Sequence, residues 1–236
     1  MLRLMCAPIL VFASTSMLLG QCQCNPVGSP SGVPENGYTW VWSYSSCEWE
    51  QEPGYGYPTP IVIDTDGTGF QLTSAEDGVM FDFYGDGKPI QMAWTAKGSR
   101  NGWLALPVDG QITSARNLFG NITAQPLSNS HPPNGFAALS IYDLPAYGGN
   151  HDGVIDPADA VWTKLRLWID VNHDGVAQPE ELHTLEEIGI RRIPLQYEPS
   201  RHTDQYGNSF RFRGSLIPAR GDLVDRKIFD VFLVTK

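Results

Sequence analysis

The chain has 236 residues, of which 42% are hydrophobic and 11% are aromatic. This composition is sufficient for a buried core and excludes a chain that is disordered throughout. The 26 acidic residues outnumber the 16 basic ones and give a net charge of −10 at pH 7, which disfavours nucleic acid as a partner because its phosphates would be repelled.

The N-terminus predicts a secretory signal peptide over residues 1–22. Arg3 supplies a positive start, and residues 4–20 are apolar or small and carry no charge, a stretch too short and wrongly flanked for a stable membrane span. We therefore expect a secreted or extracytoplasmic protein, in the periplasm or at the cell surface, without a membrane span. Residues 19–22 also resemble a lipoprotein signal, but Gln21 stands where such signals need a small residue, so lipidation is the less favoured alternative.

Residues 23–59 predict a linker with a strand or two packing on the main domain, because Pro, Gly and Ser are dense there. The stretch also holds tryptophans and tyrosines whose rings could stack on sugars, so a polysaccharide- or wall-binding patch is a second, less favoured interpretation. In an oxidising compartment we expect one disulfide from Cys47 to Cys22 or Cys24, which leaves one free thiol.

The composition changes over residues 60–236 and predicts a β-rich domain. Residues 61–63 form a β-branched run typical of a buried strand. Residues 193–197 and 210–213 alternate apolar and polar side chains on either side of a turn, which predicts a hairpin. Residues 228–234 predict a last strand.

Two Asp/Gly turns follow strand-like segments in this domain. One contains Asp64 and Asp66, and the other contains Asp82 and Asp86. Carboxylates in such turns suit calcium, but neither turn has a complete ligand set of its own. Whether either turn binds a further calcium ion is left open.

The sequence Asn-His-Asp-Gly-Val occurs twice, at residues 150–154 and 172–176. The second copy lies within residues 170–181, the second loop, which fits the full twelve-residue EF-hand calcium loop. Calcium takes six to eight oxygens, and alternate side chains of a tightly curled loop point to a common centre. The expected ligands, with a carbonyl at position 7 and a water at position 9, are Asp170, Asn172, Asp174, Val176, Gln178 and Glu181.

The first copy lies within residues 143–159, the first loop, and departs from that pattern. Its position 1 is Gly148, which has no side-chain oxygen, and its position 12 is an Asp, which reaches less far than Glu. Asp143 could return as the missing ligand if residues 144–148 bulge outward. We therefore expect a weaker calcium site, although such residues also favour turns that bind no metal. Its expected ligands are Asp143, Asn150, Asp152, Val154, Asp156 and Asp159.

Each loop is followed by a pattern typical of a short helix. An Asp-Pro pair at residues 156–157 suits a helix start, and apolar residues recur at helical spacing over residues 158–165. A similar segment, ended by Gly, follows the second loop over residues 179–189. The predicted fold class is therefore α+β: a β-rich body with an embedded pair of EF-hand-like calcium loops over residues 143–190, each followed by a short helix.

Four segments carry a resemblance to a known family, namely residues 60–67, 134–139, 149–156 and 165–182. As a set they resemble secreted bacterial EF-hand-containing proteins and are similar to calcium-binding modules of large RTX-type exoproteins. The resemblance extends over residues 60–236 and implies calcium binding and export, without an established activity for stand-alone members. Residues 144–148 interrupt the first loop relative to the RTX-type modules, which puts the affinity of that site in doubt.

The chain shows no recognisable enzyme motif, and we do not expect an enzyme. The five histidines lack zinc-ligand spacing, and no nucleophile elbow, phosphate-binding glycine loop or cysteine nucleophile motif occurs. Some RTX-type proteins cleave themselves at an Asp-Pro bond when calcium binds, but here we interpret Asp156 as a ligand and helix cap. An uncharacterised secreted hydrolase is kept as an alternative.

The predicted function is that of a secreted calcium-binding protein whose loops hold structural Ca2+. We expect it to serve a surface or matrix interaction with a polysaccharide or protein partner that the sequence does not identify. A dockerin-like partner-binding module is a further alternative, because dockerins also pair two loop-plus-helix units. Dockerins carry small hydroxyl residues at loop positions 10 and 11, where this chain has Pro-Ala and Pro-Glu.

Overall fold

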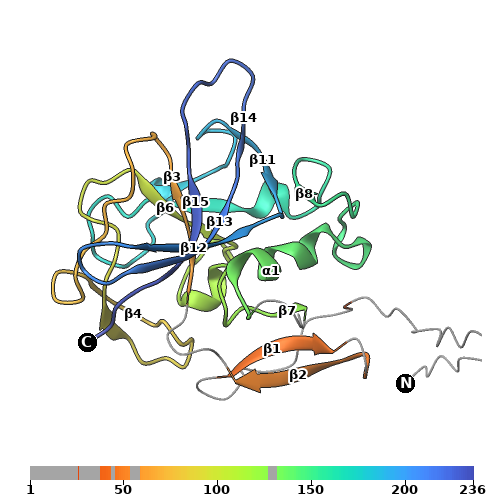
Figure 1. The fold of residues 1–236 in the computed structure, drawn as a ribbon, viewed down its shortest axis with the longest axis horizontal. Coiled ribbons are helices and arrows are strands. Elements are labelled where there is room, and N and C mark those ends of the chain that lie inside the picture. Colours follow the sequence, from red (N-terminus) through yellow and green to blue (C-terminus); the bar gives the residue numbers. More distant parts are fainter. Residues whose placement is uncertain (1–25, 27–37, 44–45, 54–58, 127–131) are drawn as a thin grey trace, which may run out of the picture.

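Figure 1 shows the fold in the computed structural model, which describes residue 26 and residues 38–43, 46–53, 59–126 and 132–236. The predicted signal peptide lies outside the described residues, as do Cys22 and Cys24. Cys47 is disulfide-bonded. No helix among the described residues is long and apolar enough to span a membrane.

A seven-stranded antiparallel sheet forms the centre of the body (Figure 1). In spatial order its strands are β10 (Leu182–His183), β9 (Arg166–Trp168), β6 (Asn101–Ala105), β3 (Ile61–Asp64), β15 (Ile228–Phe232), β13 (Ser209–Gly214) and β12 (Glu198–Thr203). The predicted strands at residues 61–63 and 228–234 thus lie side by side as β3 and β15. A hairpin forms across the predicted turn from β12 and β13, but the first predicted strand is wrong, because residues 193–194 belong to β11 of another sheet and residues 195–197 lie in no strand.

Both faces of the central sheet are buried, because successive side chains of a strand point to opposite sides. Val62 and Trp103 belong to one apolar cluster, whereas Ile63 and Leu104 belong to the other. Strand β3 is consequently buried at every position. Its sequence therefore reads as a continuous apolar run and not as an alternation.

Smaller elements cover the two faces of the central sheet. On one face lies the hairpin of β4 (Val79–Phe81) and β5 (Ile90–Met92), which joins the first cluster. On the other face lie α1 (Gly135–Ser140), β11 (Ile190–Pro194) and β8 (Val154–Ile155), which join the second cluster. Strand β14 (Ile217–Pro218) pairs with β11, but both of its residues are exposed. The molecule is therefore a β-rich body of the β-sandwich class, with apolar layers between stacked sheets.

Part of the predicted linker forms a hairpin of its own. Strands β1 (Tyr38–Ser43) and β2 (Glu48–Pro53) pair with each other, and β1 also pairs in parallel with β7 (Gln125–Pro126). Val41 and Trp42 are buried. The hairpin therefore packs along one side of the body, as Figure 1 shows.

The prediction of a short α-helix after each loop is wrong, and with it the α+β class. After the first loop the chain makes only a 3-10 turn before β9, and the second loop itself ends in another 3-10 turn that leads directly into β10. The described residues contain one α-helix, α1, and it precedes both loops. The 3-10 turns are η1 (Ala115–Asn117), η2 (Ile141–Asp143), η3 (Pro145–Tyr147), η4 (Trp162–Lys164) and η5 (Pro179–Glu181).

Sheet pairing explains why these helices do not form. Val161, Trp162 and Leu165 are buried, as the apolar spacing requires, but β9 begins immediately after Leu165. A helix this short has little stability of its own. After the second loop, Leu182 instead pairs with Trp168 and extends the central sheet. The dockerin-like alternative, which needs two loop-plus-helix units, therefore loses its structural basis.

Candidate calcium-binding loops

The second loop begins where β9 ends, and its first carboxylate is turned into the body. Asp170 is 1% exposed. Its Oδ1 accepts hydrogen bonds from the backbone N–H groups of His173 and Asp174 at 2.6 and 3.2 Å, and its Oδ2 accepts one from Gly175 at 2.9 Å. The indole N–H of Trp94 donates to the same Oδ2 at 2.8 Å. Asp170 therefore organises the turn that follows it.

In the first loop the corresponding place is taken by Asp143, at the end of η2. Asp143 is 3% exposed and accepts hydrogen bonds from the N–H groups of Asp152 at 3.1 Å and Gly153 at 2.9 Å. These donors occupy the same repeat positions as two of the donors to Asp170. Residues 144–148 lie between, partly as the turn η3. The chain thus brings Asp143 back to the loop across this insertion, while its role as a calcium ligand stays a prediction.

The two turns also share an unusual backbone conformation. His151 and His173 have φ angles of 60° and 65°, and Gly153 and Gly175 have φ angles of 82° and 72°. The left-handed region is open to glycine but unfavourable for most other residues. The repeated letters therefore encode the same turn in both loops.

The His173 ring fastens the second loop to the body. Its Nδ1 and Nε2 lie 2.7 Å from the backbone carbonyl oxygens of Thr95 and Asp77, respectively. Gly175 lies directly against β4, where any Cβ would press on Val79. The second loop is thus supported from outside itself, whereas His151 of the first loop is exposed.

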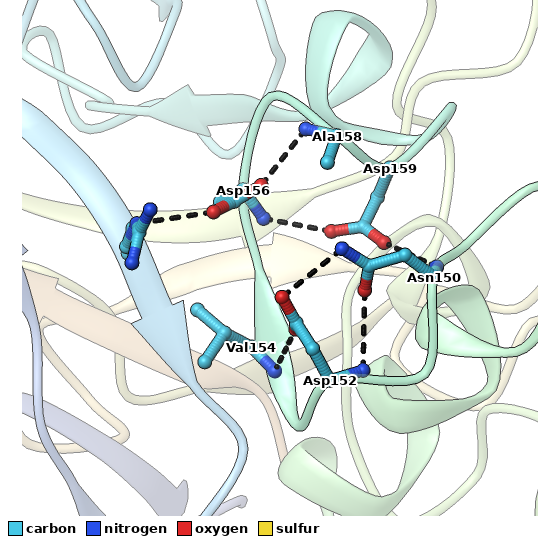
Figure 2. A network of polar contacts seen from close by, with 7 residues as sticks. Asn150, Asp152, Val154, Asp156, Ala158 and Asp159 are labelled. Carbon is cyan, nitrogen blue, oxygen red and sulfur yellow. Dashed lines mark hydrogen bonds and ion pairs between the residues drawn. The ribbon is translucent and has the colours of Figure 1, made fainter.

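Each loop ends in a buried acid that accepts backbone N–H bonds. Glu181 is 4% exposed and accepts from Val171 at 3.0 Å. Asp159 is 2% exposed and accepts from Asn150 at 3.3 Å and Asp156 at 2.8 Å (Figure 2). In both loops the closing carboxylate therefore ties the end of the loop to its beginning.

Between these acids, exposed side chains converge on an aspartate. In the second loop, Asp174 Oδ2 accepts hydrogen bonds from Asn172 Nδ2 at 2.9 Å and from Gln178 Nε2 at 2.8 Å. In the first loop, Asn150 Nδ2 donates to Asp152 Oδ2 at 3.0 Å (Figure 2). The predicted ligands at positions 3, 5 and 9 of the second loop therefore lie together.

Position 7 is equivalent in the two loops. The N–H of Val154 donates to Asp152 Oδ1 at 3.0 Å, and the N–H of Val176 donates to Asp174 Oδ1 at 2.8 Å. Each valine therefore follows its aspartate in a tight turn. The carbonyl groups of these valines are the predicted backbone ligands.

The two loops differ at position 9. In the first loop this residue is Asp156, whose Oδ2 lies 3.0 Å from Nε of Arg192 and whose Oδ1 accepts the N–H of Ala158 at 2.8 Å. Figure 2 shows Asp156 and Ala158 beside the rest of the network. In the part of the chain that the structure describes, Asp170 and Glu181 of the second loop form no ion pair. The first loop is therefore already partly neutralised by a basic side chain.

Repulsion between acidic side chains also acts in the first loop. Burial raises the pKa of Asp159, and the N–H bonds from Asp156 and Asn150 oppose that shift. The negative charges of Asp143 and Asp156 raise the pKa of Asp159 further. The neighbouring negative charges therefore disfavour ionisation of Asp159.

No three His, Cys, Asp or Glu side chains within the described ranges are close enough to hold a metal ion. The carboxylates at positions 1 and 12 are turned towards backbone N–H groups, and that of Asp174 is turned towards amide N–H groups. A half-turn of the Asn172 and Gln178 amides would present their oxygens to the same point. The available donors are then all oxygens, which fits a hard cation such as Ca2+.

Residues 61–234, which include both loops, match the model of the SPM domain family. The chain belongs to the SPM domain family. It is also 30% identical over 186 residues to the iron-regulated protein FrpA of Neisseria meningitidis serogroup C. That alignment covers 77% of this chain but only 16% of FrpA, so the chain corresponds to a small part of that protein.

The SPM domain contains a further Asp turn at the end of β3. Asp64 is fully buried and accepts hydrogen bonds from the N–H groups of Gly67 at 3.1 Å and Gly69 at 2.8 Å. Burial raises the pKa of Asp64, and these two N–H bonds oppose that shift. Asp66 is exposed and accepts bonds from Thr68. The turn is closed by its own backbone N–H groups.

Two tryptophans of the SPM domain touch the second loop, and sequence reasoning missed both. The indole N–H of Trp94 donates to Asp170, and that of Trp168 donates to Glu181 Oε2 at 3.2 Å. Their ring centroids are 5.3 Å apart. Trp94 lies 76 residues from Asp170 in the sequence, so no local pattern could reveal the contact.

Proposed function

We propose that the protein is an exported calcium-binding protein in which each EF-hand-like loop holds one structural Ca2+ ion. The observation that carries this proposal is the equivalence of the two turns. Asp143 and Asp170 are buried and organise the same N–H groups, and Asp159 and Glu181 are buried and close the loops. Such equivalence across an insertion supports a shared ligand.

The burial of these four carboxylates supports the same conclusion. An ionised carboxylate withdrawn from water is unfavourable unless it is paired or hydrogen-bonded. Backbone N–H groups offset part of that penalty, but none of the four forms an ion pair within the described residues. The whole chain carries a net charge of −10. A divalent cation at each loop would supply the missing positive charge.

The ligand chemistry favours calcium among the common cations. The candidate donors are carboxylate, amide and carbonyl oxygens, which hard cations prefer, whereas soft metals prefer Cys or Met sulfur. The name of FrpA refers to regulation by iron and concerns that protein. A twelve-residue loop with a carboxylate at its last position suits the large, irregular coordination sphere of Ca2+.

We assign the ions a structural role. Extracellular calcium modules typically bind with Kd of about 10⁻⁴ to 10⁻³ M. An ion that binds only the folded state at tenfold excess over Kd stabilises it by about 1.4 kcal/mol. The expected consequence is a higher melting temperature in calcium.

The partner of this exported protein is proposed to be a surface polysaccharide or protein. A hollow of about 210 Å³ beside the N-terminal hairpin supports this part of the proposal. Its lining includes Trp40 and Trp49 of the hairpin and Tyr142 and Tyr147 of the body. Aromatic side chains of this kind supply much of the contact energy at interfaces.

Calorimetric titration of the chelator-treated protein with CaCl2 tests the proposal. We expect two ions per chain, and we expect Glu181→Gln to remove one of them. Glu180→Gln is the matched control, because Glu180 is the adjacent acid in the same 3-10 turn but is exposed. Wild-type protein that binds no calcium would refute the proposal, and equal stoichiometry in the Glu181→Gln and Glu180→Gln variants would refute the second site.

A further inference from the structure

A third loop of the chain repeats the hydrogen bonds of the calcium loops. It follows β4 and begins at Asp82, whose Oδ1 accepts the N–H of Asp86 at 3.1 Å and whose Oδ2 accepts the N–H of Gly87 at 2.9 Å. Asp86 Oδ1 in turn accepts the N–H of Lys88 at 3.0 Å. Positions 1, 5, 6 and 7 thus bond as they do in the second loop (residues 170–181).

The backbone of this third loop (residues 82–88) follows the same course. Gly85 and Gly87 have φ angles of 67° and 80°, close to those of His173 and Gly175 at the equivalent positions, which are 65° and 72°. The side chains needed for a metal, however, are missing. Position 3 is Tyr84, and position 12, counted from Asp82, falls on a buried core alanine.

A basic side chain lies against this loop. Arg116 of η1 donates from Nη2 to the carbonyl oxygen of Tyr84 at 2.9 Å and from Nε to that of Gly85 at 3.3 Å. The N–H of Ala115 donates to the carbonyl oxygen of Asp82 at 3.0 Å, which fixes η1 beside the loop. A Cβ at Gly85 would collide with the Arg116 side chain. The loop backbone and the guanidinium are therefore in close contact.

The charges around Arg116 match this placement. Burial lowers the pKa of Arg116, and the negative charges of Asp82 and Asp86 oppose that shift. A guanidinium stays protonated at neutral pH in proteins even where burial lowers its pKa. The guanidinium is held against the loop backbone and, within the described residues, forms no direct ion pair with Asp82 or Asp86, so the attraction of these two carboxylates acts at longer range.

We propose that Arg116 is the resident cation of the third loop. Its guanidinium supplies from within the chain the positive charge that Ca2+ supplies to the first and second loops, so the third loop is ordered without metal and does not respond to calcium. The comparison with calcium rests on the proposed function, whereas the pairing of Arg116 with the loop does not.

This arrangement has a consequence for the second loop. Gly175 packs against Val79 of β4, and His173 contacts the carbonyl oxygen of Asp77 just before that strand. The third loop joins β4 to β5. The contacts of Arg116 therefore fix the β4–β5 hairpin against which the second loop packs. These contacts need no metal, so the hairpin is in place before calcium binds.

A double-mutant cycle with Arg116→Met and Asp82→Asn, measured by urea unfolding in chelator, tests the pairing. Residues in one network of hydrogen bonds and charges couple, so the effect of Asp82→Asn on the folding constant should be smaller by at least about threefold when Arg116 is already Met. Arg116→Lys keeps the charge but loses the forked donors and should give an intermediate effect. Independent, multiplicative effects of the two substitutions would overturn the proposal, whether or not the wild type binds calcium.

Calcium counting tests the second half of the proposal with Arg116 intact. Asp82→Asn should leave the number of bound Ca2+ ions unchanged, whereas Asp170→Asn, at the same position 1 of the second loop, should lower it by one. Loss of an ion in the Asp82→Asn protein would show that the third loop is itself a calcium site. This measurement does not use the Arg116→Met variant, so it can be interpreted even if that variant fails to fold.

Discussion

Replacement of Asp230 by Asn should make the protein more stable at neutral pH. Asp230 lies on β15 and is 0% exposed, and neither of its carboxyl oxygens meets hydrogen-bond geometry with a partner among the described residues. Burial raises its pKa from 3.8 to about 7. The nearby Thr59 hydroxyl, Gly135 N–H and Arg211 charge oppose this shift only in part.

The sign and size of the effect follow from proton linkage. Below pH 3.8 the carboxyl is protonated in the folded and unfolded states, and its burial carries no ionisation penalty. Between pH 3.8 and about 7 the unfolded chain ionises while the folded protein keeps the proton, so the free energy of unfolding falls as pH rises. Each pKa unit corresponds to about 1.4 kcal/mol, which sets a ceiling of about 4 kcal/mol for a shift of about 3 units.

Urea unfolding in excess calcium at pH 5, 6, 7 and 8 measures this effect. The free energy of unfolding of Asp230→Asn relative to wild type should increase by about 1–3 kcal/mol between pH 5 and pH 7 and then level off. Asp225→Asn, on an exposed residue of the preceding segment, controls for the loss of one negative charge. If the difference in the free energy of unfolding between Asp230→Asn and wild type does not change with pH, the assignment of a buried, protonated Asp230 is refuted.

Three further predictions concern the loops. Asp143→Ala should weaken only the first calcium site, and Asp152→Ala should abolish it; calorimetry that finds equal affinities at both sites would contradict this. Trp94→Phe should lower the free energy of unfolding by about 1–3 kcal/mol more than Trp103→Phe. The reason is that the Trp94 indole N–H donates to Asp170, whereas the Trp103 indole N–H has no hydrogen-bond partner among the described residues. Equal losses of both variants in urea unfolding would show that the bond to Asp170 is not the cause. Calcium should raise the melting temperature without exposing apolar surface, so a strong rise in binding of a hydrophobic dye would favour a sensor.

The sequence predicted the features that depend on neighbouring residues. The β-branched run at residues 61–63 is the centre of β3, and the second alternating segment, residues 210–213, lies in β13. The repeated Asn-His-Asp-Gly-Val letters encode the same left-handed turn twice, because His and Gly recur at the two positions with positive φ. In each case a short stretch of chain determines its own conformation.

The two predicted helices that do not form show the limit of predictions from local sequence patterns. Val161, Trp162 and Leu165 are buried as their spacing predicts, although Ala158 is exposed, but both a 3-10 turn and a helix can bury the same side chains. Pairing of Leu182 with Trp168 in the central sheet decides the outcome, and it joins segments on opposite sides of the second loop. Tertiary pairing of this kind overrides local propensity.

The contacts that distinguish the loops were beyond sequence reasoning for a similar reason. Trp94 reaches Asp170 across 76 residues, and Arg116 reaches Tyr84 across 32 residues. Neither contact leaves a spacing signal, since the partners lie on elements that only the folded sheet brings together. The positions of the acidic residues alone therefore do not predict that the second loop contacts an indole and the third loop a guanidinium.

The surroundings of the loops argue for an ion that fastens the fold and against one that moves it. In sensor EF-hands, calcium opens a pair of helices and exposes an apolar groove. Here the second loop lies between β9 and β10, which pair with each other through Trp168 and Leu182, and the first loop is followed by a 3-10 turn that leads into β9. No flanking helix pair occurs in the described residues that could act as a lever. An ion in either loop would therefore tighten the ends of strands that the core already holds, which is why we expect calcium to change stability and not shape.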